Sequence, residues 1–472
     1  MRGPRPRRGG ALRGILARHE VALVPLLLLF LALAVWFPEH PSDERGYLEL
    51  AHNLTQGEYT GLGWRPASPY PSPDPAEPDL WFGPGLPLAI TPLVAADLPV
   101  QVVRLASPLV LFLAVLLFFR FLRLYVGYRA ALLGAYALGS YFPFYVLLSN
   151  LHSEPLAILM IVAMLYCLAR YVRGGSLRFG LLGGLSAAGV ALTRVAFGWV
   201  VTAMLVVFLV AWLIARRPAL GRIAVVYSVA LALCLPWLAF TYSETGRVFL
   251  WGNSGGLSLY WMSSPHRQDL GDWRGGAYEI VVSDPRLAHH KQFFVELAPL
   301  DPDEQNRRLE RAALDNIRGH PLKFAKNVAA NGSRMWFDMP FSDKRQSLST
   351  LFYLVPNSLV LWLLVICSIQ LLRRRSRIPV EALAFAAFAG LAFGLHAVLA
   401  AYPRMLMPLI PIAIWVVVYT VGTTTNQEPA RGRRQTHRAG GSPGGRRTRR
   451  ARVRPPESAS GPSSAGGGSR PS

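Results

Sequence analysis

The sequence predicts an all-α polytopic membrane protein with about ten transmembrane helices, external interfacial helices and a small external, mostly helical domain. Composition is the first reason, because 52% of the 472 residues are hydrophobic and only 16% are charged, whereas a soluble domain carries about 25% charged residues. Distribution is the second reason, because the net charge of +22 lies in short clusters between long apolar runs. These features exclude an ordinary soluble enzyme and a disordered chain.

Ten apolar runs have lengths suited to crossing a bilayer, which takes about 17–25 residues. They are residues 21–37, 101–123, 128–147, 155–172, 177–193, 196–215, 221–242, 349–372, 380–400 and 404–422. The first run could instead be a signal peptide, because Ala32-Leu33-Ala34 resembles a cleavage site. We favour an uncleaved span, because the run from Val21 to Phe37 is long for the apolar part of a signal peptide.

Basic residues give the orientation. Thirty of the 49 lie in residues 1–20, after residue 422, or in the turns that follow the second, fourth, sixth and eighth runs. If the runs alternate, all these positions share one side, which the positive-inside rule assigns to the cytoplasm. We therefore expect a multi-pass protein of the cell membrane with both termini in the cytoplasm. The excess of Arg over Lys, 45 to 4, favours a GC-rich bacterial source and hence the bacterial cytoplasmic membrane.

This orientation divides the chain into five parts. They are a basic cytoplasmic N-terminus (1–20), a transmembrane module (21–242) whose first external loop (38–100) holds candidate catalytic residues, an external domain (243–348), C-terminal transmembrane helices (349–422) and a disordered basic tail (423–472). The tail has eleven Arg, each of which would attract anionic lipid by about 1 kcal/mol near a membrane. We expect it to contact lipid or solvent and not nucleic acid.

The external domain carries helix signals of its own. Asp301 and Pro302 are typical of an N-cap and a first helical position, so we expect a helix from there to about Arg318. A second helix should cover residues 322–336. The neighbouring pair His289 and His290 should point apart on regular structure, and no carboxylate-rich cluster surrounds it in the sequence. We therefore expect no metal site and no cofactor.

The three cysteines, Cys167, Cys234 and Cys367, each lie inside an apolar run and are expected to be small core residues. A disulfide framework or a thiolate metal site is therefore not expected.

The clearest candidates for chemistry are carboxylates at the outer ends of the runs. Asp43 and Glu44 follow the first run, and Glu154 is the only acid between the third and fourth runs. A carboxylate at the boundary of water and lipid can accept a proton from a hydroxyl. The alternative for Asp43 and Glu44 is a solvated loop with a helix cap, and for Glu154 a favourable charge at a helix N-terminus.

Two arginines complement these acids. Arg194 and Arg404 are each the only cation of an external turn, and a guanidinium there can hold a phosphate through two hydrogen bonds. The alternative is an interfacial Arg whose stem lies along the lipid. His396 is an ionisable group inside a predicted span, which suggests a functional role; the alternative is a neutral His bonded to a neighbouring helix.

Several segments, in this order along the chain, resemble motifs of the GT-C fold glycosyltransferases that use lipid-phosphate sugars, such as protein O-mannosyltransferases and the lipid A aminoarabinose transferase. They are Asp43-Glu44-Arg45-Gly46-Tyr47, Gly83-Pro84-Gly85-Leu86-Pro87, Ser153-Glu154-Pro155, Leu192-Thr193-Arg194, Asn253-Ser254-Gly255-Gly256, Ile317-Arg318-Gly319-His320-Pro321 and Tyr402-Pro403-Arg404. Val195 and Met405 stand where the family has Pro and Tyr, which indicates a divergent branch.

The resemblance implies transfer of a sugar from a polyprenyl-phosphate carrier to a hydroxyl at the outer membrane face, with inversion and without a metal. Asp43 would be the general base, Glu44 or Glu154 an orienting carboxylate, and Arg404, with Arg194, the clamp on the donor phosphate. Residues expected to line the substrate site are Tyr47, His152 and His396. The partners implied are the lipid-linked sugar and an acceptor hydroxyl of cell-wall glycan, lipid or protein.

Two other functions compete with this one. A transporter or flippase for lipid-linked saccharides would place its polar residues near the middle of the bilayer, and a non-catalytic scaffold would leave them dispersed. The transferase hypothesis requires Asp43 and Arg404 to line one cavity at the outer boundary of the membrane.

Overall fold

The computed structural model describes residues 20–37, 43–61, 80–274, 278–343, 348–373, 378–399 and 401–425. Every regular element in these ranges is a helix. Seven helical segments of the described residues are long and apolar enough to cross a membrane: Val100–Leu122, Ser153–Gly174, Ala196–Ala215, Pro218–Thr245, Leu351–Arg373, Val380–Val398 and Pro403–Thr423. The predicted class, an all-α multi-pass membrane protein, is confirmed.

All ten apolar runs coincide with helices, but three of the helices are shorter than a full span. These are α2 (Val24–Trp36) with the preceding turn η1 (Val21–Leu23), α7 (Tyr128–Gly139) and α9 (Leu177–Thr193). The run 128–147 departs most, because α7 ends at Gly139 and the chain continues as the short 3₁₀ helix η2 (Phe142–Leu147). Pro143 in η2 has no N–H to donate to an α-helix.

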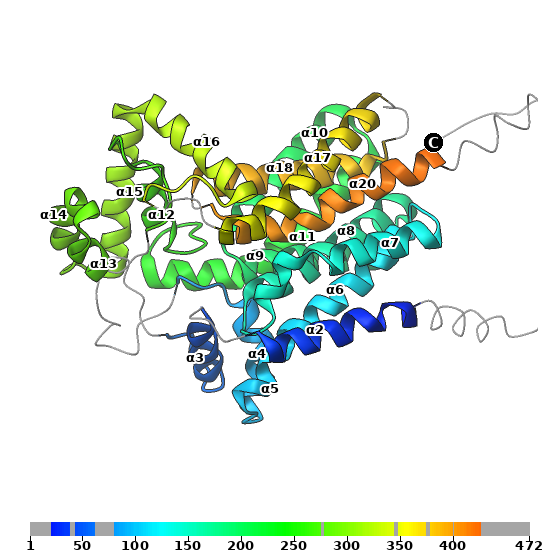
Figure 1. The fold of residues 1–472 in the computed structure, drawn as a ribbon, viewed down its shortest axis with the longest axis horizontal. Helices are drawn as coiled ribbons and strands as arrows, with labels where there is room; N and C mark the ends of the chain where they lie inside the picture. The colour runs from blue at the N-terminus through cyan, green and yellow to red at the C-terminus, as the bar shows by residue number, and fades with distance from the viewer. Residues whose placement is uncertain are drawn as a thin grey trace, which may run out of the picture. The chain divides into compact units, whose positions relative to one another are not determined.

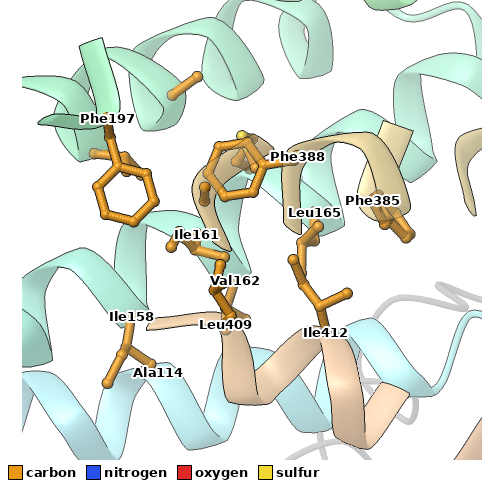
Figure 2. Close-up of a cluster of buried hydrophobic side chains, with 14 of the residues drawn as sticks. Ala114, Ile158, Ile161, Val162, Leu165, Phe197, Phe385, Phe388, Leu409 and Ile412 are labelled. Atoms are coloured by element: carbon orange, nitrogen blue, oxygen red, sulfur yellow. The ribbon is translucent and has the colours of Figure 1, made fainter. Parts of the chain in front are cut away.

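The spans pack around α8 (Ser153–Gly174), which contacts α6 (Ala106–Leu122) and α9. Figure 2 shows why α8 is central: Ile158, Ile161, Val162 and Leu165 meet aromatic and aliphatic side chains from several other helices. Those partners are Phe197 of α10 (Ala196–Ala215), Phe385 and Phe388 of α18 (Val380–Val398), Leu409 of η6 (Met407–Leu409) and Ile412 of α20 (Ile410–Thr425). α8 is thus buried on most of its surface.

Small residues let α9 approach α11 (Pro218–Thr245) closely. A Cβ added at Gly184 would lie 2.5 Å from a methyl of Val229 and 3.0 Å from the carbonyl of Val226. Because lipid is as apolar as the helices, no hydrophobic force drives membrane helices together, and close backbone packing stabilises their association instead. The three cysteines are buried, as expected.

The predicted external domain gathers at one end of the bundle (Figure 1). Its helices are α12 (Gly255–Met262), α13 (Tyr278–Ser283), α14 (Ala288–Leu297), α15 (Pro302–Gly319) and α16 (Pro321–Phe337). Both predicted helices are confirmed, and the Asp301 carboxylate accepts hydrogen bonds from the backbone N–H of Asp303 and Glu304 at 3.1 and 2.9 Å. The domain has its own apolar core, which includes Leu257, Tyr260, Trp261, Phe294 and Leu309.

The helices of the predicted first external loop lie near the same end of the bundle. α3 (Glu44–Leu54) packs on α4 (Gly85–Ala95), and α5 (Val100–Arg104) leads into α6. Figure 1 shows that α2 begins and α20 ends at the opposite end, away from α12–α16. The described ends of the chain therefore share one side of the bundle. C-terminal to α16, α17 (Leu351–Arg373) packs against α20.

Candidate active site

A cavity of about 370 Å³ lies where several spans begin or end. α3, α8, α10 and α19 (Pro403–Leu406) start beside it, and α9 and α18 finish beside it. Three charged side chains line its wall, namely Asp43, Arg194 and Arg404. The external domain contributes Trp273 and the start of α12, so the cavity lies between the bundle and this domain.

Glu154 connects the two arginines. It lies in the first turn of α8, is 0% exposed, and its Oε1 accepts hydrogen bonds from Nη1 of Arg194 and Nε of Arg404. Its Oε2 has no hydrogen-bond partner among the described residues. A buried carboxylate between two guanidinium groups offsets their charge and fixes their orientation. The alternative, that Glu154 is only a favourable charge at a helix N-terminus, does not account for its contacts with both arginines.

Asp43 faces the cavity instead of capping α3. Its side chain makes no capping hydrogen bond, and its Oδ2 accepts from Nη2 of Arg404 at 2.6 Å. The Asp43 side chain is 37% exposed and that of Arg404 is 24% exposed, so both can be reached from the cavity. Arg404 thus bridges Asp43 and Glu154. The charges of the two acids and two arginines cancel.

Tyr47 lies directly beside these charges. It lines the cavity and is 3% exposed, and burial, followed by the Asp43 carboxylate, raises its pKa above the usual range. Burial also raises the pKa of Tyr402, which lines the cavity next to Arg404. Both phenols therefore stay protonated and can donate hydrogen bonds.

Aromatic rings line another part of the cavity and were not predicted. Trp81 and Trp273 have ring centroids 5.9 Å apart, and Phe82 lies 4.7 Å from Tyr47. The signal in the sequence was a pair of aromatic residues directly before Gly83-Pro84-Gly85. Only Trp273 lacked any such local signal.

The Gly83-Pro84-Gly85 turn packs tightly on the end of α9. A Cβ at Gly83 would lie 2.1 Å from the Leu192 carbonyl oxygen, and one at Gly85 would lie 2.5 Å from Oγ1 of Thr193. Glycine is therefore required at both positions. The contact fixes the cavity wall next to Arg194.

The two histidines predicted to line the site differ in their positions. His396 is buried and lines the cavity, and its Nδ1 bonds the Ala392 carbonyl of its own helix at 2.8 Å, so Nε2 is left as an acceptor. His152 instead lines a smaller cavity with Leu86 and Ser107. Burial lowers the pKa of His152.

Glu44 does not line the cavity. Its carboxylate accepts from Nε and Nη2 of Arg104 at distances of 2.7–3.1 Å, and from the backbone N–H of Leu151 at 2.8 Å. The ion pair joins α3 to α5 and to the segment before α8, which indicates a structural role.

We expect Arg104→Ala to lower the free energy of unfolding by about 3–5 kcal/mol, because it leaves the carboxylate of Glu44 buried without this cation. Thermal unfolding in detergent would measure the loss. Adding Glu44→Gln to Arg104→Ala should recover part of it, because the double variant buries no charge there. Equal stability of Arg104→Ala and the wild type would contradict the structural role.

The expectation that His289 and His290 point apart is wrong. Both Nε2 atoms approach Oδ2 of Asp269, at 3.2 and 3.0 Å. Consecutive residues of a helix project about 100° apart, yet both rings, in the first turn of α14, reach one carboxylate oxygen from the loop between α12 and α13. His266 completes a group of three imidazoles.

Comparisons with known proteins found similar solved structures only. No family model matches, and no curated protein matches. The archaeal oligosaccharyltransferase AglB from Archaeoglobus fulgidus, in complex with an inhibitory peptide and a dolichol-phosphate, is 16% identical over 90% of this chain and 52% of its own, with a TM-score of 0.47. This chain therefore spans about half of AglB.

Two further structures overlap similar shares of this chain. ArnT from Cupriavidus metallidurans, bound to undecaprenyl phosphate, is 14% identical over 87% of this chain and 78% of its own, with a TM-score of 0.39. Arabinosyltransferase EmbB from Mycobacterium smegmatis is 13% identical over 90% of this chain and 43% of its own, with a TM-score of 0.35. Because every one of these TM-scores is below 0.5, the likenesses assign no activity, and function has to be inferred from the cavity.

Proposed function

We propose that this chain is a membrane glycosyltransferase that moves a sugar from a polyprenyl-phosphate carrier to a hydroxyl acceptor at the outer face of the cell membrane, with inversion at the sugar carbon. One observation carries the proposal. Asp43, Glu154, Arg194 and Arg404, from four separate segments, form a single ion-paired group beside one cavity.

The arginines supply the donor side. A sugar on a phosphate carrier leaves behind a charged phosphate, which needs electrostatic stabilisation more than a proton. Arg404 and Arg194 can bind its oxygens through paired hydrogen bonds. Glu154 holds both guanidinium groups in place before the donor arrives, so little reorganisation is needed in the transition state.

Asp43 supplies the acceptor side. Its Oδ2 accepts a hydrogen bond from Nη2 of Arg404. A donor phosphate that bound this nitrogen would compete with Asp43 for the same hydrogen bond. Donor binding would thus free the carboxylate to accept the proton of the acceptor hydroxyl. The acceptor oxygen then bonds to the sugar carbon, the bond from that carbon to the phosphate oxygen breaks, and polyprenyl phosphate leaves with the electron pair.

The geometry of such a step sets the stereochemistry. A base and a leaving group on opposite faces of the sugar give inversion, as in inverting glycosidases. The rings of Trp81 and Trp273, 5.9 Å apart, offer apolar faces against which a sugar can pack.

The place of the cavity favours transfer over transport. The charged residues of the ion-paired group beside it lie at the ends of spans, with Glu154 in the first turn of α8, Arg194 after the last residue of α9 and Arg404 in the first turn of α19. A transporter places its substrate site near the bilayer midplane.

The test is a lipid and glycan profile of cells that lack this chain. AglB and ArnT were solved with dolichol-phosphate and undecaprenyl phosphate, so sugars on both carriers are the donors to follow. We expect one polyprenyl-phosphate sugar to accumulate and one glycosylated product to vanish, with both restored by the wild-type chain. The restored product should carry the anomeric configuration opposite to that of the donor. Unchanged pools of all such donors would contradict the proposal.

A further inference from the structure

A second group of ionisable side chains lies in the external domain, apart from the cavity residues. The imidazoles of His266, His289 and His290 offer ligand nitrogens that all lie within 4.8 Å of one another. The ring centroid of His266 lies 4.1 Å from that of His289 and 5.3 Å from that of His290. Asp269 joins the group through Oδ2, which is 3.2 and 3.0 Å from Nε2 of His289 and His290.

The two separations between Asp269 and these imidazoles suit a tetrahedral metal. Around Zn²⁺, nitrogen and oxygen ligands at about 2.0–2.2 Å lie about 3.3 Å from each other. Two of the ligand–ligand distances to Asp269 already approach this value. Three imidazoles and one carboxylate form a donor set that zinc prefers, whereas magnesium and calcium prefer oxygen ligands.

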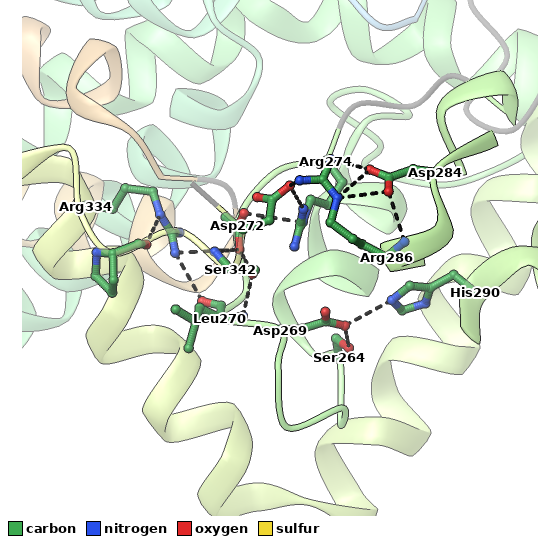
Figure 3. A network of polar contacts seen from close by, with 12 residues as sticks. Ser264, Asp269, Leu270, Asp272, Arg274, Asp284, Arg286, His290, Arg334 and Ser342 are labelled. Carbon is green, nitrogen blue, oxygen red and sulfur yellow. Dashed lines mark hydrogen bonds and ion pairs between the residues drawn. The ribbon is translucent and has the colours of Figure 1, made fainter. Parts of the chain in front are cut away.

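The surroundings of the group support the same conclusion. Nδ1 of His290 lies 2.8 Å from the Tyr260 hydroxyl, which orients the ring and turns Nε2 toward Asp269. Such a hydrogen bond on the far nitrogen is usual for histidines that bind metals. Asp269 is 5% exposed, and its Oδ1 has no hydrogen-bond partner among the described residues. The Ser264 hydroxyl donates to the other oxygen, as Figure 3 shows.

We propose that the external domain binds one divalent transition-metal ion, with Zn²⁺ as the best fit, through His266, Asp269, His289 and His290. The ion joins the loop that follows α12, which carries His266 and Asp269, to the first turn of α14. Two imidazoles approach the same oxygen of Asp269 and a third packs on them, so three possible ligand nitrogens and one carboxylate oxygen gather in one place.

The site is structural and stabilises one wall of the cavity. The loop that carries Asp269 continues through Asp272, whose carboxylate binds Arg274 at 3.3 Å and the backbone N–H of Ser342 at 3.2 Å (Figure 3). The next residue, Trp273, lines the cavity. The zinc site does not depend on the proposed sugar transfer, since it is formed by different residues.

The test measures metal content on the full-length protein in detergent, purified through a tag without histidine. After incubation with ZnCl₂ and removal of free metal by gel filtration, we expect the wild type to retain about one zinc per chain. The variant His266→Ala/His289→Ala should retain at least about tenfold less. It spares His290, which is 2% exposed, and should therefore fold.

His320→Ala is the matched control, because His320 is exposed and lies at the junction of α15 and α16, outside the group. It should retain as much zinc as the wild type. Thermal unfolding should shift downward when a chelator is added to the wild type and to this control, but not for the double variant. A wild type without zinc, or equal zinc in all three proteins, would overturn the proposal, and neither result would bear on sugar transfer.

Discussion

Asp43→Asn is expected to lower sugar transfer by about 10²–10⁴-fold while the protein still inserts and folds, because the amide keeps the shape of the carboxylate but cannot accept a proton from the acceptor. The substitution removes the charge that contacts Arg404 at 2.6 Å, but the other contact of Arg404, with the buried Glu154, remains. The loss should therefore appear mainly in kcat, with a smaller effect on the KM for the lipid donor.

The matched control is Glu58→Gln, because Glu58 follows α3 in the same external loop and is exposed to solvent. It should transfer sugar at the wild-type rate. Both variants would be assayed in membranes of cells that lack the native chain, by following the product of the lipid profile described above. Wild-type activity of Asp43→Asn would exclude this residue as the base.

Arg404→Gln should reduce kcat/KM for the lipid donor by about 10²–10³-fold, the effect of removing one group that stabilises charge in a transition state. It should also destabilise the fold, but by less than the about 3–5 kcal/mol of a buried charge left without any partner, because Glu154 is 0% exposed yet retains Arg194 as its cation. Arg404→Lys should recover only part of the activity, since an ammonium cannot bridge two carboxylates as a planar guanidinium does.

A double variant separates the two effects of Arg404. Arg404→Gln alone leaves two acids, Asp43 and Glu154, with one arginine. In Glu154→Gln/Arg404→Gln one acid and one arginine are removed together, so the remaining charges balance and thermal stability should rise above that of Arg404→Gln alone. Activity should stay low, because the phosphate has lost its ligand. Recovery of both stability and activity would mean that Arg404 only stabilises the fold. Arg318→Gln is the control for loss of a cation, because the Arg318 side chain is 75% exposed. It should leave both stability and activity at the wild-type level.

Local signals in the sequence were sufficient for the helices. The apolar runs predicted the spans because each span must satisfy its own backbone hydrogen bonds in lipid. Asp301 and Pro302 predicted the start of α15 because a cap acts on the next few residues only. The error at residues 128–147 has a local cause as well, since Pro143 lies within an otherwise apolar run.

The site was only partly predictable. Asp43 and Glu44 are adjacent and were both candidate catalytic residues, yet one faces the cavity and the other binds Arg104, because side chains next to each other on a helix point in different directions. Trp273 carried no local signal because its place depends on how the external domain packs. The histidine group stayed hidden for a similar reason, since Asp269 is 20 residues from His289.

The amino-acid sequence by itself determined that this chain is a helical membrane protein, where its spans lie and which polar residues flank them. Only the tertiary structure decided which of those residues meet. Arg404 contacts Glu154 across 250 positions of the chain and Asp43 across 361. Hydrophobic periodicity and capping act over a few residues, whereas contacts at such separations depend on how whole helices pack, which no local pattern encodes.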